Sequence, residues 1–149
     1  MRLIIAYLIT LLAINLYFDV ILVSNWQPQE LSAIKTLLYC ILAGGLGGII
    51  YCLRGIYLSA CVRKDWDKVW YPWYFIRPIV SMLTGGVSFV FLKAGLLVLD
   101  SQSKPNSSHL AFYAVAFIAG LNVDKFIAKL EDIAKTTWGI DKSRTSNND

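Results

Sequence analysis

The sequence predicts an all-α integral membrane protein with four transmembrane helices and an amphipathic C-terminal helix in the cytoplasm. Apolar residues make up 56% of the 149 residues, against about 45–50% in a typical soluble domain. These residues gather in long runs, and a helix of about 20 apolar residues crosses a bilayer. The runs lack the strict alternation of membrane β-strands, so helices must satisfy the backbone polar groups in lipid.

A single membrane domain, residues 1–138, is expected to contain all four spans. We place the spans at about residues 3–23, 31–53, 72–99 and 107–126. The first run is long, is interrupted by Asn15 and Asp19, and precedes no small-x-small site, which favours an uncleaved span over a signal peptide. The fourth has a purely apolar run that is short for a full crossing. Three spans, with the fourth segment only dipping into the membrane, is the structural alternative.

The segments around the third span carry interfacial signals. Residues 54–71 mix basic and aromatic side chains, a composition typical of the membrane–water interface. We therefore expect the second helix to continue past the hydrocarbon along the surface. Pro72 suits the first turn of the third helix, and Pro78 is expected to kink this helix or delay its regular start.

The end of the chain is expected to form an amphipathic helix over about residues 124–138. Phe126, Leu130 and Ile133 fall on one helical face, and charged residues occupy the rest. Gly139 is a stop signal for this helix. The remaining residues, 139–149, are predicted to be a disordered tail.

The distribution of basic residues predicts the orientation in the membrane. Eleven of the 14 Lys and Arg residues fall in the N-terminus, the stretch 54–77 and the C-terminal part. The other three, Lys35, Lys93 and Lys104, fall near the opposite side. Under the positive-inside rule, four spans put both termini in the cytoplasm. We accordingly expect a multi-pass membrane protein.

Ionisable residues inside the apolar runs are candidate functional residues. Asp19, Lys35 and Lys93 are expected at a similar depth below the outer surface, and Asn15 lies one turn from Asp19 on the same face. They would form an ion pair that fixes helix register, or polar elements of a pore or its gate. Proton relay is a further alternative.

Small residues at four-residue spacing predict close helix packing on three of the four spans. They are Gly44 and Gly48, Ser81 and Gly85, and Ala116 and Gly120. Packing within one monomer and formation of a homo-oligomer are both consistent with this pattern.

A basic and aromatic group is expected near the cytoplasmic face. It contains Arg54 and Arg77 beside Trp70 and Trp73. Binding of lipid phosphate is the simplest interpretation of such a patch. A partner protein or a charged ligand is the alternative.

The sequence contains no recognisable enzyme motif. The three cysteines form no CxxC pair, and His109 has no second histidine or cysteine nearby, so we expect no metal site. The glycine-rich run from Gly44 to Gly48 lacks the Lys-Ser/Thr of a phosphate loop. We expect no catalytic residue, no cofactor and no nucleic-acid partner.

Three short motifs resemble those of small multi-spanning bacterial inner-membrane proteins. They are Gly-Gly-Leu-Gly-Gly-Ile-Ile-Tyr-Cys-Leu-Arg ending at Arg54, Trp-Tyr-Phe-Ile-Arg-Pro ending at Pro78, and Ala-Phe-Ile-Ala-Gly-Leu-Asn ending at Asn122. Some proteins of this size and shape act as membrane effectors in anti-phage systems, including retron-type ones. The resemblance therefore implies a protein that permeabilises the inner membrane when a sensor is activated.

The functional expectation is a non-enzymatic membrane protein that forms a homo-oligomer and permeabilises or depolarises the bilayer when triggered. The trigger would come from a cytoplasmic sensor or partner, through the loop after the second span and the C-terminal helix. One alternative is a membrane anchor or accessory subunit of a complex. A small proton-coupled transporter with Asp19 as its coupling carboxylate is another, although the sequence shows no internal repeat.

Overall fold

The computed structural model describes residues 2–24, 32–64, 67–95 and 108–140, and the predicted helical class is confirmed over this part of the chain. The helices, in chain order, are α1 (Arg2–Ser24), α2 (Ser32–Tyr57), the π-helical turn η1 (Leu58–Arg63), the 3₁₀ turn η2 (Lys68–Trp70), α3 (Tyr71–Lys93), α4 (Ser108–Leu121) and α5 (Val123–Trp138). The segment around Trp26, most of the polar loop before α4 and nearly all of the expected tail lie outside the described residues.

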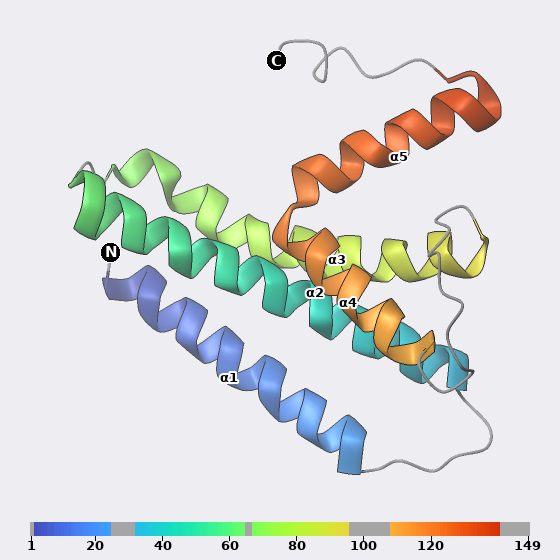
Figure 1. The fold of residues 1–149 in the computed structure, drawn as a ribbon. Coiled ribbons are helices and arrows are strands. Elements are labelled where there is room, and N and C mark those ends of the chain that lie inside the picture. The colour runs from blue at the N-terminus through green and yellow to red at the C-terminus, as the bar shows by residue number, and fades with distance from the viewer. Residues whose placement is uncertain (1, 25–31, 65–66, 96–107, 141–149) are drawn as a thin grey trace.

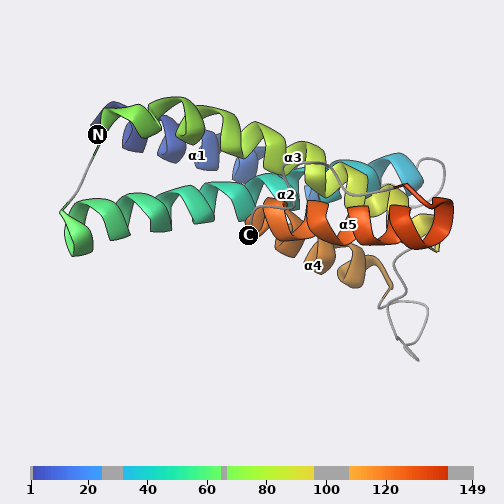
Figure 2. The same ribbon diagram turned by 90° about the horizontal axis from the view of Figure 1, so that it is seen from above.

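Helix α2 is the centre of the bundle. Helices α1 and α3 run antiparallel to it, and α4 runs in the same direction as α2 (Figure 1). Turning the molecule by 90° shows α5 lying over the half of the molecule that holds the start of α2 and the end of α3 (Figure 2). Helices α1, α3 and α4 therefore each pack against α2, whereas α5 contacts α4 and α3.

Two apolar clusters hold the two ends of α2. At one end, Ile4 and Leu8 of α1 pack with Ile56 of α2 and Tyr74 of α3. At the other end, Cys40 of α2 packs with Phe89 of α3 and Ala116 of α4. The apolar side chains that α1 contributes thus lie at one end of α2, and those of α4 lie at the other.

Large apolar side chains cover much of the outside of α1. Leu3, Ile9, Tyr17 and Val20 are each more than half exposed. Such a helix would be unstable in water, but its side chains suit a lipid surface. Helices α1, α2 with η1, and α3 are long and apolar enough to cross a membrane.

The helix boundaries agree with the sequence prediction in some places and differ in others. Helical structure continues past Tyr57 through η1 to Arg63, as the basic and aromatic stretch predicted. Helix α3 has a proline at its start, as expected, and is continuous through the buried Pro78. It ends at Lys93 rather than near residue 99, because Gly95 adopts a left-handed conformation with φ 74°, a common helix terminator.

The fourth segment differs most from the single span expected at residues 107–126. The helix breaks at Asn122, whose φ of −123° and ψ of 58° are not helical, so α4 ends at Leu121. Helix α5 then starts at an angle of 110° to α4 and ends at Gly139, which has φ 69°. By length and composition, the described residues contain three helices able to cross a membrane, or four if α4 and α5 together count as one broken span.

Candidate functional site

The site is built on a junction where three helices approach each other through glycine. A Cβ added to Gly44 of α2 would lie 2.8 Å from the Cα of Gly85 in α3. A Cβ added to Gly120 of α4 would lie 2.6 Å from the Cα of Gly44. Carbon atoms normally pack at about 3.5–4.0 Å. The three backbones are therefore close enough that only glycine fits at these positions.

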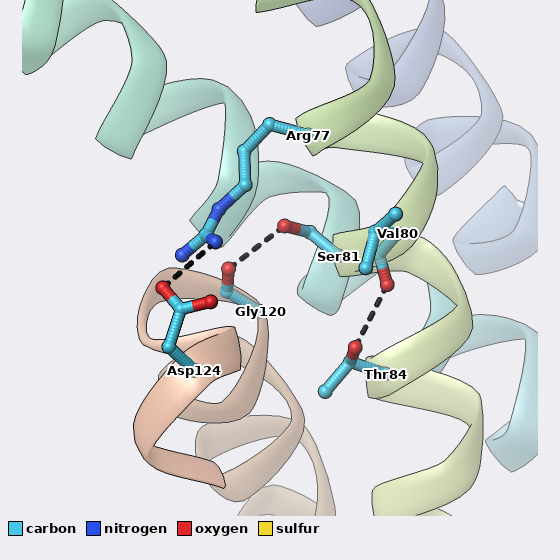
Figure 3. Close-up of polar contacts among 6 residues, drawn as sticks. All are labelled: Arg77, Val80, Ser81, Thr84, Gly120 and Asp124. Carbon is cyan, nitrogen blue, oxygen red and sulfur yellow. Dashed lines mark hydrogen bonds and ion pairs between the residues drawn. The ribbon is translucent and has the colours of Figure 1, made fainter. Parts of the chain in front are cut away.

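The remaining predicted packing residues surround this junction. Ser81 is fully buried, and a Cβ on Gly48 would overlap its side chain. The Ser81 hydroxyl donates a hydrogen bond of 2.9 Å to the carbonyl oxygen of Gly120 (Figure 3). This carbonyl lies in the last turn of α4, where backbone acceptors lack helical partners. Ala116 is fully buried one turn earlier.

An ion pair fastens α5 to the bundle just beyond this junction. The Nη1 atom of Arg77 in α3 lies 3.0 Å from Oδ2 of Asp124 in the first turn of α5 (Figure 3). Arg77 is 6% exposed, whereas the Asp124 side chain is 81% exposed. A buried cation is thus balanced by a carboxylate at the surface, and the bond joins α3 to α5 just after the bend that follows α4.

The Asp124 carboxylate is the only charged group that the structure shows paired with the buried Arg77 side chain among the described residues. Its guanidinium lies 4.8 Å from the ring centroid of Tyr51 and 5.5 Å from that of Trp73, which gives cation–π attraction. Its Nε and Nη2 atoms are buried and have no hydrogen-bond partner. Removing one partner of a buried ion pair costs about 3–5 kcal/mol, whereas exposed pairs contribute about 0–1 kcal/mol. A half-exposed pair of this kind is expected to contribute about 1–3 kcal/mol.

A cleft of about 460 Å³ lies between the end of α2, η1 and the start of α3. The predicted basic and aromatic residues Arg54, Trp70 and Trp73 line it, together with Arg63 and Tyr51, which the sequence did not single out. Arg77 is not among the lining residues, but it stacks on two of the rings that are. The structure therefore brings three of the four predicted residues, Arg54, Trp70 and Trp73, to one cleft. Arg63 adds a second guanidinium group to its lining.

The polar residues expected to share one depth have different surroundings. Asn15 is 1% exposed, lies beside Gly45 of α2 and has no hydrogen-bond partner for either side-chain polar atom. Asp19 and Lys35 are half-buried. Lys93 is exposed in the last turn of α3, with its ammonium 5.7 Å from the ring centroid of Phe89. Lys93 is the last residue of α3, so it lies at the end of this helix rather than inside a span that continues to about residue 99.

The cysteines have no shared site in the described part of the chain. Cys40 and Cys52 are buried at different ends of α2, and Cys61 is exposed on η1. Among the described residues, no group of three or more His, Cys, Asp or Glu side chains is placed to hold a metal ion.

Over the described residues, the fold is all-helical and contains three or four helices long and apolar enough to span a membrane. Its distinctive features are a glycine junction and a charged contact at the bend before its last helix. No family model, no curated protein and no solved structure matches this chain. The function must therefore be argued from its own residues.

Three residues of the site, Tyr51, Arg63 and Asp124, were not singled out from the sequence. Asp124 looked like an ordinary charge on an amphipathic helix, although an acid four residues after a buried glycine at a helix end is a detectable signal. Nine residues separate Arg63 from Arg54, a spacing that places the two side chains on opposite faces of a regular α-helix. Only the π-helical turn brings both to one cleft.

Proposed function

We propose that this chain is a non-enzymatic membrane effector that increases membrane permeability when a signal displaces its last helix, α5. The observation that supports the proposal is the ion pair between Arg77 and Asp124. Loss of the carboxylate would leave a buried arginine without its charged partner, which destabilises the bundle. Any partner that pulls α5 away therefore also loosens the helices in the membrane.

The proposed orientation places both termini in the cytoplasm of a bacterium, with the protein in the inner membrane. Phe112 of α4 packs against Phe89 of α3 with ring centroids 5.6 Å apart, and Asp124 reaches Arg77. Between these two contacts α4 runs antiparallel to α3 as far as Leu121, which is about 14 Å from Phe112 at 1.5 Å per residue. The start of α5 thus lies level with Arg77, six residues into α3, and α5 then lies over the other half of the molecule (Figure 2). The positive-inside rule favours the cytoplasm for the end of the bundle where α3 begins.

The leak itself would arise among the helices rather than through a preformed channel. Helix α1 packs mainly on α2, and it buries the unsatisfied amide of Asn15 against Gly45. An unsatisfied buried polar group costs about 1–3 kcal/mol. This cost destabilises the contact between α1 and α2, so we expect these two helices to separate first. We propose that loosened copies associate and that Asn15 and Asp19 then line the leak.

A biological setting for such an effector follows from the resemblance noted in the sequence. Depolarisation of an infected cell would stop growth before phage are released. The sensor would be a separate cytoplasmic protein that binds α5, since this helix leaves the bundle at an angle of 110° to α4.

Membrane potential in bacteria that express the chain tests the proposal. Asp124→Asn removes the charge and keeps the size of the side chain, and Asp124→Glu is the matched control because it keeps the charge. We expect Asp124→Asn to depolarise cells, and to admit a DNA-binding dye, at an expression level where the wild type and Asp124→Glu leave the potential intact. An intact potential in all three, at equal membrane abundance, would contradict the leak.

The exposed apolar side chains of α5 favour a second candidate, a membrane anchor for a soluble partner. Ile127 is 45% exposed and Trp138 is 58% exposed. An anchor would use these side chains to hold its partner and would leave the membrane potential unchanged in every variant.

A further inference from the structure

The cleft beside α3 has the charge of an anion site. Arg54 and Arg63 line it, and its described lining residues include no acid. Within the described part of the chain, neither guanidinium makes a hydrogen bond or an ion pair. Arginine presents a planar fork of donors that matches two oxygens of a phosphate group. Two such groups lining one cleft are suited to binding a phosphate group.

The π-helical turn is what places the second arginine. Nine residues separate Arg54 from Arg63, and at 3.6 residues per turn this separation is about two and a half turns. On a regular α-helix the two side chains would lie on opposite faces. From Leu58 to Arg63 the helix winds more residues into each turn, and Arg63 lines the same cleft as Arg54. Turns of this type are frequent at functional sites.

The walls of the cleft strengthen an anion site. Tyr51, Trp70, Trp73 and Tyr74 supply aromatic rings, which exclude water and present apolar surface to the part of a ligand beyond its phosphate. Arg77 does not line the cleft, but its guanidinium lies over the rings of Tyr51 and Trp73. It therefore adds a third positive charge near the cleft. The cleft thus combines positive charge with an apolar wall, as a phosphorylated amphiphile requires.

We propose that this cleft binds a phosphate-bearing anion, with Arg54 and Arg63 as its ligands and the aromatic side chains as its wall. An anionic lipid headgroup and a soluble phosphorylated molecule share this chemistry. The position of the cleft, beside interfacial aromatic residues at the end of a predicted span, suits the lipid. The inference does not depend on the proposed leak, because binding is measured without any membrane current.

Native mass spectrometry of the full chain in detergent can test this site. The probes are dioctanoyl phosphatidylglycerol, the zwitterionic dioctanoyl phosphatidylcholine, and sn-glycerol 3-phosphate as the soluble phosphate. The test variant is R54Q/R63Q, and K125Q/K129Q is the matched control that removes two charges from exposed positions on α5. R54K/R63K keeps the charge but removes the planar fork.

We expect phosphatidylglycerol to bind the wild type more tightly than phosphatidylcholine does. R54Q/R63Q should lose at least about tenfold in affinity, the effect of one charge-assisted hydrogen bond, and K125Q/K129Q should change less than about twofold. Weak binding of sn-glycerol 3-phosphate identifies the lipid as the source, and binding as tight as that of phosphatidylglycerol identifies a soluble phosphate. Equal binding of the two lipids, or unchanged binding by R54Q/R63Q, would overturn the proposal.

Discussion

Substitution of a single glycine in α2 should show how much the junction of three helices contributes to stability. In Gly44→Ala the new methyl group would lie 2.8 Å from the Cα of Gly85 and 2.5 Å from the carbonyl oxygen of Ser81. Both are backbone atoms, so the helices must separate by about 1 Å to reach normal carbon contacts. Overpacking costs about 1–3 kcal/mol, and replacing a helical glycine by alanine recovers up to about 1 kcal/mol. We expect a net destabilisation of about 2 kcal/mol.

The same helix offers a matched control for this experiment. In Gly55→Ala the methyl group would meet only the Tyr74 ring, with its hydroxyl 3.4 Å away. We expect Gly55→Ala to be neutral or to stabilise the helix by up to about 1 kcal/mol. Unfolding of the purified protein in mixed micelles with increasing dodecyl sulfate, followed by circular dichroism, measures both variants. If Gly44→Ala is as stable as Gly55→Ala, the helices are not packed through Gly44, and the proposed junction is refuted.

Three further predictions follow from the same geometry. Ser81→Ala should cost about 1 kcal/mol in the micelle assay, because it removes a bond between helices. Thr84→Ala, whose hydroxyl bonds only within its own helix, should cost less, and equal losses would contradict this assignment. Asn15→Leu should stabilise the bundle by about 1–3 kcal/mol because it removes a buried amide without a partner, and a loss of stability would show that the amide is satisfied. Cys61, the exposed cysteine, should react with a membrane-impermeant maleimide in opened cells but not in intact cells if η1 is cytoplasmic, and labelling of intact cells would reverse the orientation.

The helices themselves were predictable, because lipid leaves the backbone few alternatives. A chain with long apolar runs must satisfy its N–H and C=O groups within each run, and the helix is the structure that does so. The local signals also worked where they act on the backbone directly. A proline lies at the start of α3, and Gly139 ends α5 with a positive φ.

The partners of the predicted packing residues could not be predicted from spacing. Small residues four apart show that a helix can approach another backbone, but they do not say which one. In the structure, Gly44 faces Gly85 and Gly120 within one chain. These particular faces are therefore already occupied in the monomer, which the sequence left open.

The sequence by itself determined the class of this protein, since composition and run length dictate helices in lipid. It also indicated which residues are small enough for close packing and which basic residues gather near one end. Only the tertiary structure decided that Arg77 finds its carboxylate 47 residues away and that a π-helical turn brings Arg63 beside Arg54. The physical reason is that local backbone chemistry sets where helices form. Contacts between helices depend on which residues are close in space, and the spacing of residues along the sequence does not determine this.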